Sequence, residues 1–125
     1  MFLRPLPVYN TVTMSDKHST ILSLLRAIAS LDRNFPLPYF VFLLEVARNE
    51  GCSLGDLRKV TGMPLPTCSR ILWALSTKRQ TGAKPYGLIE HDYAPDNHRR
   101  KTIRLSAKGR ALVSRVTDIL DQRAA

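Results

Sequence analysis

The chain has 125 residues, the size of one domain with a modest core. Its hydrophobic share of 44% is ordinary for a globular protein, and no apolar run approaches the roughly 18 residues that a membrane span needs. The first residues lack the apolar core and cleavage site of a signal peptide, so we expect a cytoplasmic protein. Two cysteines, Cys52 and Cys68, are too few for a disulfide framework or a cysteine metal cluster.

Positive charge is concentrated in the second part of the chain. Nineteen basic and ten acidic residues give a net charge of +9. Residues 1–52 hold five basic and four acidic side chains, a net of +1, whereas residues 53–125 hold fourteen and six, a net of +8. A cluster of Lys and Arg suits a polyanion, because each contact with a phosphate releases condensed counterions. A solubilising surface or a membrane-facing patch would give the same excess, so charge alone leaves these alternatives open.

Two helices are predicted in the first part of the chain. Residues 1–14 contain prolines and show no helical or strand period, so we expect an N-terminal arm there. Ser15 is a candidate N-cap for a helix that ends near Leu31. Its apolar residues follow helical spacing: Ile21, Leu24, Leu25, Ile28 and Leu31. A second helix is predicted from Pro38 to a stop at Gly51, and the apolar residues around it indicate a central core helix.

The stretch from Ser53 to Ser76 predicts a helix-turn-helix. Ser53 and Asp56 match the S-x-x-D pattern of a capping box, so the first helix is expected to run from Ser53 to about Val60. Its buried side would hold Leu54, Leu57 and Val60. Gly62 can supply the positive φ that a sharp turn over residues 61–64 needs. The second helix is predicted from about Pro66 to Ser76.

This second helix has one apolar and one polar face. Four residues recur at the spacing of a core face: Cys68, Ile71, Leu72 and Leu75. The opposite face carries the candidate DNA contacts Pro66, Thr67, Ser69, Arg70 and Trp73, together with Ala74. Such a face suits the major groove, where Arg70 could bond guanine or a phosphate and Thr67 and Ser69 could contact phosphates or a thymine methyl. The alternative is an ordinary solvated helix face.

A two-stranded hairpin with a basic tip is predicted next. Its strands would be residues 87–93 and 101–105, with a turn over residues 94–100. The candidate contacts at the tip are Asn97, His98, Arg99, Arg100 and Lys101. Such a finger suits the minor groove, where narrow A·T-rich tracts attract Arg, and Asp96 could orient Arg99 through an ion pair. The alternative is a solvated loop tip.

The remaining polar residues suggest phosphate contacts but no catalytic or metal site. The basic loop over residues 77–86 could follow a phosphate strand or simply connect helix and hairpin. The candidate phosphate contacts are Ser53, Lys78, Arg79 and Lys84. His91 and His98 do not have the spacing of a metal site, and neither a nucleophile–base pattern nor a glycine-rich phosphate loop is visible. We therefore predict no metal, no cofactor and no enzymatic activity.

A last helix is expected after its cap, Ser106. Its apolar stripe could fold back on the first helix or meet its copy in a dimer: Leu112, Val113, Val116, Ile119 and Leu120. Together the elements predict a mainly α domain over residues 15–125 with about five helices and a small β-hairpin. This is a winged helix-turn-helix with flanking N- and C-terminal helices.

Residues 37–113 resemble the MarR-type winged helix-turn-helix regulators. Gly87-Leu88-Ile89 is similar to the G-L-[IV] of that family, and Leu105 to Gly109 match its L-[ST]-x-x-G. The segment Thr67-Cys68-Ser69-Arg70 resembles the T-V-S-R of its recognition helix. The wing tip departs from the D-x-R pattern, because Asn97 stands two residues before Arg99 and Asp96 lies one place earlier.

The resemblance implies a homodimer, joined through the N- and C-terminal helices, on a pseudo-palindromic DNA operator. It implies that Arg99 enters the minor groove and that Thr67, Ser69 and Arg70 face the major groove. Release by a small phenolic or other aromatic effector is common in the family. We therefore expect a sequence-specific transcriptional regulator, most simply a repressor, located on the nucleoid. The alternatives are a plasmid or phage replication or partition protein, or a winged-helix module that binds RNA or protein.

Overall fold

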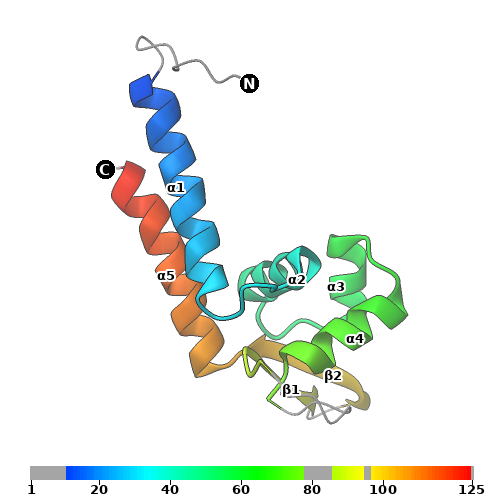
Figure 1. The fold of residues 1–125 in the computed structure, drawn as a ribbon. Helices are drawn as coiled ribbons and strands as arrows, with labels where there is room; N and C mark the ends of the chain where they lie inside the picture. The colour runs from blue at the N-terminus through cyan, green and yellow to red at the C-terminus, as the bar shows by residue number, and fades with distance from the viewer. Residues whose placement is uncertain (1–10, 78–85, 95–96, 125) are drawn as a thin grey trace. The chain divides into compact units, whose positions relative to one another are not determined.

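The computed structural model describes residues 11–77, 86–94 and 97–124. Its elements are α1 (Thr11–Ala29), α2 (Leu37–Arg48), α3 (Leu54–Thr61), α4 (Leu65–Leu75), β1 (Ile89–Ala94), β2 (Asn97–Leu105) and α5 (Ala107–Ala124) (Figure 1). The described part thus contains five helices and one two-stranded antiparallel sheet, which confirms the predicted fold class. The chain divides into two compact units. One runs from Phe35 to Val113, and the other holds α1 and the part of α5 from Ser114 onward.

Helix α2 lies at the centre of the unit that contains the helix-turn-helix. Its residues Phe42, Leu43 and Val46 have no exposed surface. Pro36 is its N-cap and Pro38 lies in its first turn, where the missing amide hydrogen costs nothing. The predicted core helix is confirmed, although it starts at Leu37 rather than Pro38 and ends at Arg48, before the predicted stop at Gly51.

The helix-turn-helix follows from local sequence signals. The Ser53 hydroxyl accepts a hydrogen bond from the Asp56 amide at 3.1 Å, and the Asp56 carboxylate accepts one from the Ser53 amide at 3.0 Å. This is the expected capping box. Gly62 has a φ of 73°, and its amide donates to the Arg58 carbonyl at 3.0 Å, so the turn has the predicted left-handed residue. Val60 differs from its prediction, since half of its surface is exposed.

The hairpin is longer than predicted. Its antiparallel register runs from Ile89↔Leu105 to Tyr93↔Lys101, and after an irregularity Ala94 pairs with Asn97. The expected turn over residues 94–100 was therefore wrong, because β2 begins at Asn97. A ladder of backbone hydrogen bonds needs no apolar side chains, so it continues into the polar segment. Residues 95–96 lie outside the described part.

The base of the hairpin is fixed to the helical core. The Gly51 amide donates to the Ile103 carbonyl at 2.8 Å, and the Ile103 amide donates to the Cys52 carbonyl at 2.9 Å. The α2–α3 connection thus forms a bridge beside β2. Leu88, Ile89 and Ile103 have no exposed surface. The wing therefore starts from a rigid, buried root.

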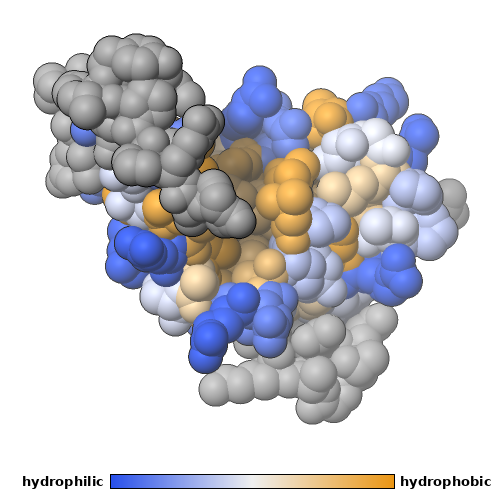
Figure 2. All heavy atoms as spheres, turned by 45° about the horizontal axis from the view of Figure 1, so that its top comes forward, coloured by the Kyte–Doolittle hydropathy of each residue, from blue (hydrophilic) through white to orange (hydrophobic). Residues whose placement is uncertain are grey.

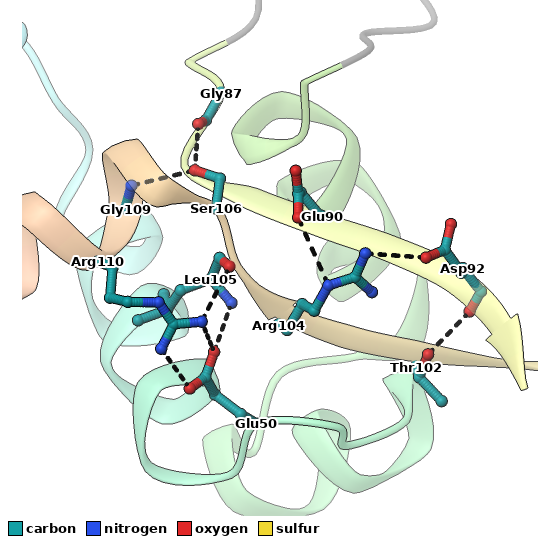
Figure 3. Close-up of polar contacts among 10 residues, drawn as sticks. All are labelled: Glu50, Gly87, Glu90, Asp92, Thr102, Arg104, Leu105, Ser106, Gly109 and Arg110. Carbon is teal, nitrogen blue, oxygen red and sulfur yellow. Dashed lines mark hydrogen bonds and ion pairs between the residues drawn. The ribbon is translucent and has the colours of Figure 1, made fainter.

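Ser106 caps α5 as predicted. Its hydroxyl accepts a hydrogen bond from the Gly109 amide at 3.0 Å and donates to the Gly87 carbonyl at 2.6 Å (Figure 3). One side chain thus ends the hairpin, starts the helix and ties both to the segment before β1.

In the other unit, α1 begins earlier than expected. It starts at Thr11, so Ser15 lies inside the helix and the predicted arm cannot extend to residue 14. The β-branched residues of its first turn have low helix propensity, which concealed this start. Arg115 of α5 donates to the Ser30 hydroxyl at 3.2 Å, next to the end of α1. In the described part of the chain, no helix combines the length and hydropathy needed to cross a bilayer.

Candidate nucleic-acid interface

Helix α4 separates a buried face from an accessible face. The predicted core residues Cys68, Ile71, Leu72 and Leu75 are buried, as expected. Among the candidate contacts, Pro66 and Arg70 are exposed and Thr67, Ser69 and Trp73 are half-buried. Ala74 was wrongly placed on the open face, since it is 2% exposed. Pro66, Thr67, Ser69 and Arg70 therefore share the accessible side of the helix.

Arg70 and Thr67 form a pair one turn apart on this accessible side. The Arg70 Nη2 atom donates to the Thr67 hydroxyl at 3.4 Å. That distance is near the upper limit for a hydrogen bond, so the guanidinium can exchange this partner for a stronger acceptor at little cost. A guanine edge or a phosphate oxygen is such an acceptor.

Trp73 was predicted to present its ring to solvent, and this prediction was wrong. It is half-buried, and it meets His91 of β1 edge to face, with ring centroids 4.9 Å apart. Helical spacing alone placed Trp73 on the open face, but a strand distant in sequence packs beside this end of α4. Trp73 therefore connects the helix with the hairpin.

Sequence reasoning missed Leu65 on the same face. α4 begins at Leu65 rather than at Pro66, and Leu65 is 48% exposed. It stands four and eight residues before Ser69 and Trp73, so the three lie in one row along the helix. The available signal was Pro64, which is the N-cap and makes Leu65 the first helical residue.

The predicted wing contacts lie where the structure describes backbone alone. Asn97, His98, Arg99, Arg100 and Lys101 belong to β2, and their side chains are outside the described part, as is the expected ion pair between Asp96 and Arg99. The loop residues Lys78, Arg79 and Lys84 also lie outside it. The hydroxyl oxygen of the remaining phosphate candidate, Ser53, accepts the Asp56 amide in the α3 cap, and this bond leaves the hydroxyl hydrogen available to a phosphate oxygen.

Arg104 uses its charge inside the hairpin. Its Nη2 lies 2.9 Å from the Asp92 carboxylate, and its Nε lies 3.5 Å from the Glu90 carboxylate (Figure 3). Exposed ion pairs contribute little to stability. Glu90 and Arg104 are nevertheless directly opposite each other in the antiparallel register, so their ion pair links the two strands of the hairpin. Arg104 contributes to the positive charge of residues 53–125, yet the carboxylates of Asp92 and Glu90 balance it here.

Arg110 is likewise bound within the protein. It forms a two-point ion pair with Glu50 at 2.8 and 2.9 Å, and the same carboxylate accepts the Leu105 amide at 3.0 Å (Figure 3). The Arg110 hydrogen bond and then the Leu105 amide lower the pKa of Glu50. Glu50 follows α2, Leu105 ends β2 and Arg110 lies in the first turn of α5. The cluster therefore fixes the junction where the hairpin becomes a helix.

Comparison with known proteins bears on the fold. No protein-family model matches the sequence, and no curated protein matches it significantly. Solved structures do match. The DNA complex of S. aureus MepR has a TM-score of 0.71 at 21% identity and covers 90% of this chain and 85% of MepR. A mutant MarR from E. coli has a TM-score of 0.62 at 18% identity and covers 96% and 80%.

A third structure is that of Bordetella bronchiseptica BpsR, from work on the regulation of its DNA binding by 6-hydroxynicotinic acid. It has a TM-score of 0.57 at 20% identity and covers 97% of this chain and 81% of BpsR. The chain has the MarR-type winged helix-turn-helix fold. Within this MarR-type fold, α3 and α4 form the helix-turn-helix and β1 and β2 form the wing.

Proposed function

We propose that this protein is a sequence-specific double-stranded DNA-binding regulator of transcription. The observation that carries the proposal is the accessible face of α4, where Ser69 and Arg70 lie beside a wing rooted in the same core. A helix of this kind fits the major groove, and Arg and hydroxyl side chains bond base edges and phosphates. A structure of similar fold was solved as a DNA complex. The wing cations, above all Arg99, then contact the minor groove.

The protein acts as a homodimer through its terminal helices. Three large apolar side chains of α1 are about half exposed: Ile21, Leu22 and Leu25. Leu120 of α5 is exposed to a similar degree, and Figure 2 shows apolar side chains reaching the surface among hydrophilic ones. The predicted stripe of α1 therefore leaves part of its apolar surface uncovered, and a second copy would bury it. Two copies of α4 would then meet two half-sites of a pseudo-palindromic duplex.

The regulator is a cytoplasmic, nucleoid-bound repressor that a small aromatic effector releases. BpsR, which shares the fold, has DNA binding that 6-hydroxynicotinic acid regulates. An effector that binds the free protein better than the DNA-bound one must weaken DNA binding by the same factor.

Selection of bound duplexes from a random pool, with light scattering of the free protein, tests the proposal. We expect an inverted repeat, a mass of two chains and affinity that falls steeply as salt rises. Equal affinity for every duplex, or tighter binding to single-stranded RNA, would overturn it. Selection of directly repeated sites would instead indicate a replication or partition protein.

A further inference from the structure

We infer that Leu65 contacts the C5-methyl group of a thymine in the major groove and contributes to sequence preference; this inference rests on the proposed DNA-binding function. Leu65 is the first residue of α4 and is 48% exposed. A single exposed leucine is common on protein surfaces and by itself indicates nothing. Its position relative to the polar contacts is what distinguishes it.

Leu65 lies on the row of α4 that leads to Ser69 and then to Trp73. Arg70 lies on the adjacent row, four residues and one helical turn after the exposed Pro66. In a recognition helix the N-terminal residues contact base edges. The best partner for an apolar side chain there is the thymine C5-methyl, which is the only methyl group that the four bases present in the major groove; cytosine has a C5–H in its place.

The neighbours of Leu65 reinforce this chemistry. Pro64 and Pro66 are both exposed, and neither has a backbone amide hydrogen to offer a base or a phosphate. The first turn of α4 is therefore an apolar segment, whereas Arg70, one turn later, carries the charge. Such an order predicts a thymine, in each half-site, beside the base that Arg70 contacts.

The chain contains a matched control for Leu65. The tripeptide Pro64-Leu65-Pro66 at the start of α4 is repeated as Pro36-Leu37-Pro38 at the start of α2. Leu37 is also the first residue of its helix, also follows a proline N-cap and is 68% exposed. A Leu→Ala change therefore has the same local effect on the helix start at both sites, and Leu65 alone lies on the face of α4.

The experiment replaces each thymine of a selected duplex in turn by uracil, which removes only the methyl group. For the wild-type protein, we expect one position in each half-site where uracil raises Kd about three- to fivefold, the scale of one buried methyl group. Leu65→Ala should abolish that penalty at that position, whereas Leu37→Ala should keep it in full.

The result that overturns the inference is a uracil penalty that persists in Leu65→Ala, or no penalty at any thymine in the wild type. If Leu65→Ala binds too weakly to measure, Leu65→Val supplies the comparison, and its penalty should be smaller than that of the wild type. Failure of the wild-type protein to prefer any duplex would instead refute the proposed function, so the two failures are distinguishable.

Discussion

Trp73 of α4 and His91 of β1 meet edge to face, with ring centroids 4.9 Å apart and an interplanar angle of 85°. The contact joins the helix proposed for the major groove to the first strand of the wing. A link between two binding elements reduces the number of arrangements that DNA must select from, and this preorganisation lowers the cost of binding. We therefore expect Trp73 to contribute to the proposed DNA binding through the position of the hairpin.

A double-mutant cycle between these rings measures their link. We expect Trp73→Leu and His91→Leu each to lower the free energy of unfolding, with a coupling of about 0.5–1.5 kcal/mol, the usual range for aromatic pairs. Chemical denaturation of the four proteins gives the coupling. If the two changes in unfolding free energy are additive, and only Trp73→Leu loses DNA affinity, then Trp73 contacts DNA directly, as the sequence predicted.

Gly109 allows α5 to pack against the segment before β1. A Cβ at residue 109 would overlap the Leu88 carbonyl oxygen, which also accepts the Ser106 amide at 3.0 Å. We expect Gly109→Ala to cost about 3 kcal/mol of unfolding free energy, because the obstacle is backbone and cannot rotate away. Gly55→Ala is the matched control, since a Cβ there meets only the Ser53 hydroxyl oxygen at 3.8 Å. It should stabilise α3 by about 0.5–1 kcal/mol. Equal thermal midpoints for the two variants would contradict this account.

Local signals in the sequence predicted the elements well. The Ser53–Asp56 capping box, the left-handed Gly62 and the Ser106 cap each depend on residues within a few positions, and all three are confirmed. The start of α1 shows the limit of such signals. Helix α1 begins at Thr11, within a segment of β-branched residues that have low helix propensity, so helical periodicity did not reveal this start.

The burial and the partners of individual side chains could not be predicted, because they depend on contacts between residues distant in sequence. Helical spacing placed Trp73 in solvent, because no pattern in α4 announces a strand that packs beside it. The Glu50–Arg110 pair joins residues 60 positions apart, so it left no local signal. Val60 and Leu25 have the spacing of a core face, yet both are half exposed. An apolar stripe reports which face is hydrophobic, but not how much of it the fold covers.

The Glu50 cluster predicts how stability depends on pH. The Arg110 hydrogen bond and the Leu105 amide lower the pKa of Glu50 below its ordinary value of 4.5. The stabilisation is therefore complete above pH 4.5 and is lost as the pH falls through the lower pKa of the folded state. We expect Glu50→Gln to melt at a lower temperature than wild type at pH 7 and to show a smaller decline from pH 5 to about pH 3. Glu45→Gln, which removes the exposed Glu45–Arg48 pair, controls for the loss of a surface ion pair. Parallel melting curves for wild type and Glu50→Gln across this pH range would refute the prediction.

Burial should make Cys52 unreactive in the folded protein. Desolvation, and then the nearby Asp56 carboxylate, raise the pKa of Cys52 from 9.0 to about 11. The thiolate is the reactive form, so folding lowers its population about 100-fold below pH 9, apart from any steric protection. Mass spectrometry after iodoacetamide treatment at pH 8 should find Cys52 modified in urea and unmodified in buffer. Equal alkylation rates in urea and in buffer would show that the thiol is accessible.

The same raised pKa of Cys52 predicts that the stability of the folded state falls as the pH rises from 9.0 to about 11.

Two arginines should contribute to DNA binding in different ways. Arg99→Ala should weaken binding to the selected duplex by about 1–3 kcal/mol, the scale of one specific contact. Arg70→Ala should relax the preference among bases, because its guanidinium lies on the accessible face of α4 and makes a long bond to Thr67 that a base edge can replace.

Fluorescence anisotropy at fixed salt, against the selected duplex and a scrambled one, separates these effects. Arg48→Ala is the control for the loss of one exposed arginine, since Arg48 lies on α2 and pairs with Glu45 at 3.3 Å. Because most non-specific affinity comes from phosphate contacts, a phosphate role for Arg70 would weaken binding to both duplexes equally. Unchanged affinity in Arg99→Ala would remove the wing from the mechanism and leave α4 as the element that contacts DNA.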